Sequence, residues 1–118
     1  MSVEVSPTEI RAPRGARLLE VAWSDGRQTR HPHRVLRGFC PCAHCQGHQG
    51  PVAWIAATDA LPDKALELTN LEEVGSYGLR LDWGDGHATG IYSFAFLRAL
   101  GPLADADAVA LGRARFTR

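Results

Sequence analysis

The chain has 118 residues, 45% hydrophobic and 22% charged, which is typical of one folded globular domain. Lys and Arg together number 13, as do Asp and Glu, so the formal net charge is zero. A chain without a basic excess has no broad positive face, which argues against general capture of nucleic acid or of an anionic membrane. We predict a single domain over residues 1–118 that binds neither.

The N-terminal segment carries no targeting signal that we can identify. Residues 1–11 are polar and include Glu4 and Glu9, unlike the basic and then apolar layout of a secretory signal. No run approaches the ~18 to 20 apolar residues of a membrane helix. We therefore expect a cytoplasmic protein, in a compartment where thiols stay reduced.

The first structured segment is predicted to be a β-hairpin followed by a short helix. Large apolar side chains alternate with other residues over 19–23, the period of a strand with one buried face. Asp25-Gly26 follows, a favoured pair for the turn of a hairpin, which predicts a hairpin over 19–29. Pro32 is then expected to open a helix that ends at Gly38.

A cluster of three cysteines comes next: Cys40, Cys42 and Cys45 lie within six positions, among Gly and Pro residues that let the backbone curl. Zn²⁺ prefers a tetrahedron of thiolate and imidazole ligands, and three thiolates with one imidazole form a structural set without an open position. We predict a structural metal site, with zinc as the metal. Iron, or an iron–sulfur cluster held by thiolates, is the alternative.

Two other interpretations of the cysteines remain. A Cys40–Cys45 disulfide would leave Cys42 as an odd thiol. Burial of all three as small apolar side chains is poorly supported, because a Gly- and Pro-rich turn is unsuited to a core.

Spacing and chemistry leave the fourth ligand open among the five histidines. His44 and His48 are close in sequence, but a short loop has little length in which to fold back. His31 and His33 precede the first helix, where we expect them to face solvent. His87 follows the second Asp-Gly turn, from which a side chain can reach a neighbouring loop.

The second half of the chain is predicted to repeat the first. Leu, Trp, Asp, Gly and Thr of segment 19–29 recur in register in segment 79–89, sixty residues later. This echo fits either an internal duplication or two hairpins that share a turn. Before it, we expect a loop over 46–63 pinned by Trp54-Ile55, and then a strand over 65–74.

The second hairpin is also expected to lead into a helix. Ser93 is a suitable N-cap, and Phe94, Leu97 and Leu100 share one helical face. Gly101-Pro102 is a natural stop. The Ala-rich tail, 103–118, fits either a short helix or a disordered end. These elements predict an α+β fold with a small, mostly antiparallel sheet, one or two short helices and a zinc-binding loop.

Three segments, 36–45, 83–87 and 91–94, resemble the N-terminal domain of gamma-butyrobetaine hydroxylase and the stand-alone bacterial DUF971 proteins. The resemblance covers about residues 8–102. In the hydroxylase, three cysteines and a later histidine bind zinc. The matching positions here imply four zinc ligands: Cys40, Cys42, Cys45 and His87. Many stand-alone relatives lack the cysteines, which implies that zinc stabilises the fold without being required for it.

The same resemblance implies that the chain is not an enzyme, because the catalytic domain of the hydroxylase has no counterpart here. Relatives of this domain are appended to Mrp-type P-loop scaffold ATPases that assemble iron–sulfur clusters. We therefore expect a zinc-binding accessory module with a protein partner. An iron–sulfur carrier is the alternative, and a redox or hydrolytic enzyme is less favoured, since it needs an exposed reactive thiol or an open metal position.

Overall fold

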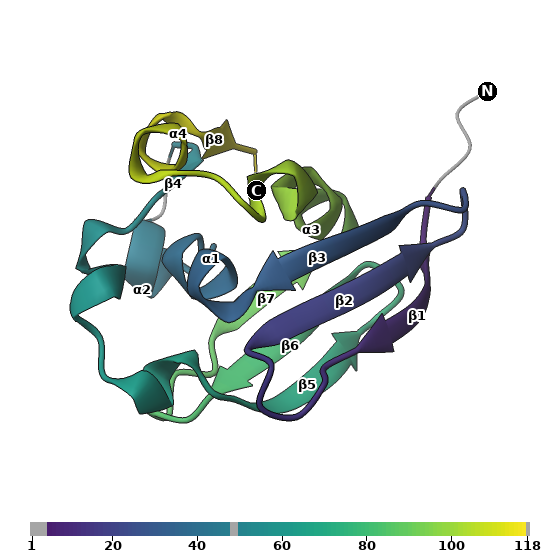
Figure 1. Cartoon of the computed structure of the whole chain (residues 1–118), viewed down its shortest axis with the longest axis horizontal. Coiled ribbons are helices and arrows are strands. Elements are labelled where there is room, and N and C mark those ends of the chain that lie inside the picture. The colour runs from purple at the N-terminus through teal and green to yellow at the C-terminus, as the bar shows by residue number, and fades with distance from the viewer. Residues whose placement is uncertain (1–4, 48–49, 118) are drawn as a thin grey trace.

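Two three-stranded antiparallel sheets, each followed by a helix, form most of the computed structural model, which describes residues 5–47 and 50–117 (Figure 1). The first unit consists of β1 (Pro7–Arg11), β2 (Leu18–Trp23), β3 (Gln28–Pro32) and α1 (His33–Gly38). The second unit consists of β5 (Leu68–Val74), β6 (Gly78–Trp83), β7 (Gly90–Ser93) and α3 (Phe94–Leu100). β2 is the middle strand of the first sheet, and β6 is the middle strand of the second.

Shorter elements connect and follow these units. Between them lie α2 (Ala43–Gln46), β4 (Val52–Ala53) and the 3₁₀ turns η1 (Ala56–Ala60) and η2 (Asp63–Leu66). After α3 come η3 (Gly101–Leu103), α4 (Ala108–Arg113) and β8 (Arg115–Phe116), and β8 pairs with β4. The predicted α+β class, with antiparallel sheets and short helices, is confirmed. The tail, residues 103–118, contains the helix α4, so the first of its two predicted alternatives, a short helix, is confirmed.

The core lies between the two units and is built by the alternation that the sequence shows. In β2 and β6 every second side chain is buried, so the large apolar residues of both strands point inward. Figure 1 shows β2 in front of β6, and one cluster of buried side chains includes both. The inward residues of the two strands are Leu19, Val21, Trp23, Leu79, Leu81 and Trp83.

The two hairpin turns have the same geometry. The Trp23 amide donates to the Arg27 carbonyl oxygen at 2.8 Å, and the Trp83 amide donates to the His87 carbonyl oxygen at 2.9 Å. Gly26 adopts φ +86° and the equivalent glycine in the second turn φ +90°, a left-handed conformation that glycine accepts without steric cost. Each turn therefore presents the residue after its glycine, Arg27 or His87, at the same place.

Each unit also binds the turn of the other. The Arg37 side chain of α1 donates to both carboxylate oxygens of Asp85, at 3.0 and 2.9 Å. The Arg98 side chain of α3 donates to both carboxylate oxygens of Asp25, at 3.3 and 2.7 Å. The repeat in the sequence is thus a repeat in the structure, extending from the hairpins to their helices.

Several strands were not predicted from the sequence. β1 contains Pro7 and an irregularity in its pairing with β2, so its residues show no clean alternation. β4 and β8 are two residues each, too short for a pattern. The segment after β4 is held against α1 by Trp54, which lies so close to Gly38 that a Cβ added at Gly38 would be 2.0 Å from the indole ring.

Candidate metal centre

The three cysteines after α1 are gathered by one short helical turn. Cys40 is fully buried, Cys42 caps the N-terminus of α2, and Cys45 lies within that helix. The amides of Cys45 and Gln46 both donate to the Cys42 carbonyl oxygen, at 3.1 and 3.0 Å. Because a single turn separates Cys42 from Cys45, their side chains reach the same point as Cys40.

His87 completes this group from the second unit. Its Nε2 atom lies 3.3 Å from Cys40 Sγ, 3.8 Å from Cys42 Sγ and 3.5 Å from Cys45 Sγ. All four donor atoms lie within 4.8 Å of one another. A tetrahedral zinc site with Zn–S of about 2.3 Å and Zn–N of about 2.0 Å has S···N edges of about 3.5 Å. The donor set therefore fits a single tetrahedral metal ion.

The position of His87 depends on an ion pair from the first unit. Asp85 accepts the His87 amide at 3.2 Å, which fixes the turn that carries the imidazole. Arg37 binds that carboxylate through two hydrogen bonds and donates a third to the Ala65 carbonyl oxygen at 3.0 Å. Since α1 runs directly into Cys40, Arg37 joins the thiolate side of the site to the imidazole side.

The charges of this ion pair suit a thiolate-rich site. The Arg37 guanidinium beside Asp85 lowers the pKa of that carboxyl to about 2. Burial opposes the charge on Arg37, but the carboxylate outweighs it, and the pKa of the guanidinium is raised. Three thiolates around a divalent cation carry one net negative charge, which a permanently charged guanidinium can offset.

Without a cation, the thiols differ in their acidity. Burial raises the pKa of Cys40 and of Cys45, so these groups favour the neutral thiol. At Cys42 burial acts in the same direction, but hydrogen bonds, led by one to Thr89, lower the pKa of the thiol. A bound metal ion deprotonates its thiol ligands, because its charge replaces the hydration that a buried thiolate lacks.

Gly90 of β7 lacks a side chain at the position where the Cys40 sulfur atom packs. A Cβ atom added at Gly90 would lie 2.8 Å from Cys40 Sγ and 3.2 Å from the Tyr92 ring. Tyr92 is itself fully buried, and its hydroxyl donates to the Leu36 carbonyl oxygen at 2.5 Å. The inner face of β7 is therefore shaped around the cysteine loop.

Two histidines contradict the expectation that they face solvent. His31 has no exposed surface, and its Nε2 atom lies 2.7 Å from the Thr29 hydroxyl. His33 is 7% exposed, with Nδ1 2.8 Å from the Leu66 carbonyl oxygen. The strand alternation of β3 turns His31 inward, whereas His33, the first residue of α1, packs edge-on against the Trp83 ring. Both positions result from tertiary packing, which the local sequence does not reveal.

Of the two remaining histidines, the structure describes His44, which is not in the donor set. His44 is exposed, and its ring centre lies 6.4 Å from that of His87. His48 lies outside the described residues. Of the candidates, the structure brings His87 to the three cysteines, in agreement with the resemblance noted above.

A cavity of about 570 Å³ adjoins the metal centre. The side chains of Cys45 and His87 form part of its wall, as do Arg37 and Asp85, which already bind each other. The other lining residues are His44, Ile55, Ala57, Thr58, Leu61 and Gly86.

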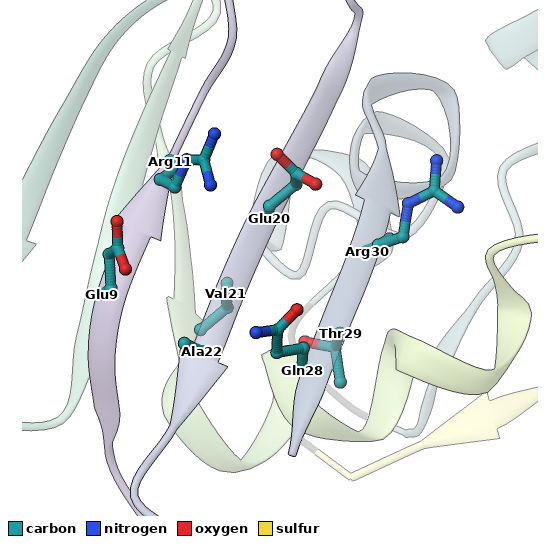
Figure 2. Close-up of a pocket in the computed structure, with 8 residues that line it drawn as sticks. All are labelled: Glu9, Arg11, Glu20, Val21, Ala22, Gln28, Thr29 and Arg30. Carbon is teal, nitrogen blue, oxygen red and sulfur yellow. The ribbon is translucent and has the colours of Figure 1, made fainter. Parts of the chain in front are cut away.

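A second hollow, of about 310 Å³, lies on the outer face of β1–β2–β3 (Figure 2). Glu20 stands between Arg11 and Arg30 on neighbouring strands, in register with both. Figure 2 shows that these side chains extend outward from the sheet. Opposite charges placed across strands support the sheet, and this surface is best described as its solvated face.

Sequence reasoning missed three residues of the site, namely Arg37, Thr89 and Gly90. One signal was present: Arg37 and Arg98 lie 61 positions apart (98 − 37), nearly the spacing of Asp25 and Asp85. Extending the repeat beyond the hairpins would have pointed to both ion pairs. Nothing local marks the contact between Gly90 and Cys40, which are 50 positions apart (90 − 40).

A search of the described residues for long apolar helices finds none able to cross a membrane.

Solved structures include several similar chains. One is the crystal structure of a protein of unknown function of the DUF971 family from Acidithiobacillus ferrooxidans, with 32% identity and a TM-score of 0.62. The alignment covers 81% of this chain and 92% of that one. Another, a solution structure determined by NMR, has 29% identity and a TM-score of 0.65, with 86% and 73% of the two chains covered.

A further solution structure has 27% identity and a TM-score of 0.61, covering 85% of this chain and 75% of that one. A search of curated proteins gives no match. The sequence model described as "Gamma-butyrobetaine hydroxylase-like, N-terminal" matches residues 10–98, which include all four donor residues of the metal centre. The chain therefore belongs to the gamma-butyrobetaine hydroxylase-like N-terminal family.

Proposed function

We propose that this protein is a non-catalytic module in which one Zn²⁺ ion, bound by Cys40, Cys42, Cys45 and His87, stabilises a domain that docks a protein partner. The observation that carries the proposal is the compact donor set, with S···N distances of 3.3 to 3.8 Å around one point. Four protein ligands fill a tetrahedral zinc ion and leave no position for a substrate or a reactive water.

The geometry favours a single ion over an iron–sulfur cluster. In a cluster, cysteines bind different iron atoms and their sulfur atoms are held apart by the cluster itself. Here all donor atoms fall within 4.8 Å of each other, which suits one ion at their centre. With all three cysteines bound to the ion, none of them is a free nucleophile, which also argues against a thiol-based enzyme.

Elemental analysis of freshly purified, untagged protein, with an absorption spectrum on the same sample, tests this proposal. We expect about one zinc per chain and no visible absorption. Iron with charge-transfer bands would replace the proposal with the cluster carrier, and a protein without metal would reject both.

Matched histidine variants test the fourth ligand. His87→Ala should lose most of the zinc or bind it at least ten-fold more weakly, because one of four ligands is removed. His44→Ala is the control, since this exposed histidine is a neighbour of His87 outside the donor set. Equal zinc retention by the two variants would exclude His87 as a ligand.

A further inference from the structure

The outer edge of β7 is the least protected strand edge of the two larger sheets. Within the part of the chain that the structure describes, β7 pairs with β6 on one side and with no strand on the other. Proteins usually protect such edges with charges, proline or bulges. β1 has Pro7 and a bulge, β3 carries Arg30 and ends at Pro32, and β5 has a bulge and two glutamates. In contrast, β7 (Gly90–Ser93) is uncharged and regular.

The free hydrogen-bonding groups of this edge follow from the register. The Phe94 amide donates to the Tyr77 carbonyl oxygen at 2.7 Å, and residues 90–93 continue the same antiparallel pairing with β6. Inward and outward backbone groups alternate along such a strand. The N–H and C=O groups of Ile91 and the N–H group of Ser93 therefore point away from β6, where another strand could bind them. The Ser93 carbonyl oxygen is already used, because Ser93 is the N-cap of α3 and accepts the first hydrogen bond of that helix.

An apolar groove lies along the same edge. It has a volume of about 400 Å³ and is lined by Pro41, Tyr77, Ile91, Ser93 and Phe96. Tyr77 and Ile91 are 55% and 41% exposed, which makes them two of the three large apolar side chains exposed among the described residues. The third, Val109, lies on α4 and not in this groove.

We propose that this groove binds an extended segment of a partner protein, which adds to the sheet as a fourth strand beside β7 and places one large apolar side chain between Tyr77 and Ile91. The N–H and C=O groups of Ile91 and the N–H group of Ser93 supply the hydrogen bonds, and the groove selects the alternate side chain, as in other strand-addition complexes. The inference rests on the proposed docking function and identifies its surface.

The size of the surface favours a peptide over a second copy of the chain. Four residues of β7 span about 13 Å at ~3.3 Å per residue. Tyr77 and Ile91 together expose on the order of 200 Å² of side chain, judged from the 150–250 Å² that an aromatic residue can bury. Two copies would add about twice that, well below the ~1,200 to 2,000 Å² of a stable dimer. An exposed surface of this size is sufficient for one extended peptide segment.

The metal centre supports one wall of the groove. Pro41 stands between the ligands Cys40 and Cys42, and Gly90 of β7 lies against Cys40. Metal removal should therefore loosen the wall and weaken binding, whereas changes at the groove should leave the metal in place.

The test is a selection of random seven-residue peptides displayed on phage against the zinc-loaded protein. A synthetic copy of the most enriched peptide is then titrated into ¹⁵N-labelled protein by NMR. We expect enriched peptides to share a central large apolar residue, and the amide signals of Ile91 and Ser93 to shift. Ile91→Asp should weaken binding at least ten-fold, while the matched variant Val109→Asp should leave it unchanged.

Zinc content and near-ultraviolet circular dichroism are measured for each variant, so loss of the fold is distinguished from loss of the surface. No enrichment on folded protein, or equal binding to Ile91→Asp, would overturn the proposal. A concentration-dependent dimer that Ile91→Asp abolishes would assign the edge to a second copy instead. If the purified protein contained no zinc but still bound the peptide, the zinc proposal would fail and the groove would stand.

Discussion

Gly90 tests how closely the cysteine loop fits against β7. Its backbone has an ordinary strand conformation, so alanine is allowed there and its effect is steric. The added Cβ would lie 2.8 Å from Cys40 Sγ. We expect Gly90→Ala to reduce the free energy of unfolding by about 1–3 kcal/mol, the usual cost of overpacking. Zinc affinity, measured by competition with a chromophoric chelator, should fall at least ten-fold.

Gly112 provides the control, because a Cβ added there would meet no atom within 4 Å. It lies in α4, where alanine favours the helix, so Gly112→Ala should raise stability by about 0.5–1 kcal/mol. A similar decrease in the free energy of unfolding in both glycine variants would contradict the proposed contact between Gly90 and Cys40.

His31 should make the stability depend on pH. Burial lowers its pKa to about 4 from an ordinary 6.5, so the unfolded chain binds more protons than the folded one between these values. Stability from the neutral imidazole is complete above pH 6.5 and is lost as the pH falls toward 4. The loss should be on the order of 2–3 kcal/mol.

Urea unfolding at pH 7 and at pH 4.5, with a chelator in both samples, measures this loss without acid release of metal. His31→Gln should flatten the pH dependence relative to the original protein. The exposed His44→Gln is the control and should leave it unchanged. A His31→Gln variant with the original pH dependence would show that another group is responsible.

At the scale of elements, the two reciprocal ion pairs allow a matched comparison. Arg37 and Arg98 each bind the turn of the opposite unit, but only the turn bound by Arg37 carries His87. We expect Arg37→Gln to lower zinc affinity at least ten-fold, because the turn loses its support and the thiolates lose a nearby positive charge. Competition with a chromophoric chelator measures the zinc affinity of this variant.

Arg98→Gln should lower the melting temperature without changing zinc affinity, since its partner Asp25 lies in the turn of the first unit. If both variants lowered zinc affinity equally, the effect would come from general loosening of the fold and Arg37 would have no specific part in positioning His87.

For the whole molecule, metal removal should lower stability without unfolding the chain. A metal ion bound by the donor set would join Cys45 to His87, which are 42 residues apart, and would thus link the two units. The shared core of β2 and β6 does not include the donor atoms of Cys42, Cys45 or His87. We expect chelation to lower the melting temperature by on the order of 10 °C, a loss of about 2–3 kcal/mol for a domain of this size.

Scanning calorimetry before and after verified zinc removal checks this expectation, and readdition of zinc should restore the original curve. An unchanged melting temperature would contradict a stabilising role. A chain that is unfolded without zinc at 25 °C would show that the ion is essential, contrary to what the resemblance implies.

The sequence by itself determined the elements whose causes are local. Alternation over 19–23 and 79–83 predicted β2 and β6, and Ser93 with Gly101-Pro102 predicted the bounds of α3. These succeed because strand alternation, turns and caps depend on residues a few positions apart. The cysteine spacing likewise indicated a metal site, since three thiolates so close in sequence suit one ion.

Only the tertiary structure decided how distant segments meet. Chemistry left five histidines as candidates for the fourth ligand, and packing of the second hairpin against α1 brings His87 to the cysteines. The same packing buries His31, pairs Arg37 with Asp85 and sets Gly90 against Cys40. Such contacts form when two sheets bury their apolar faces together, a long-range event that no local pattern in either segment records.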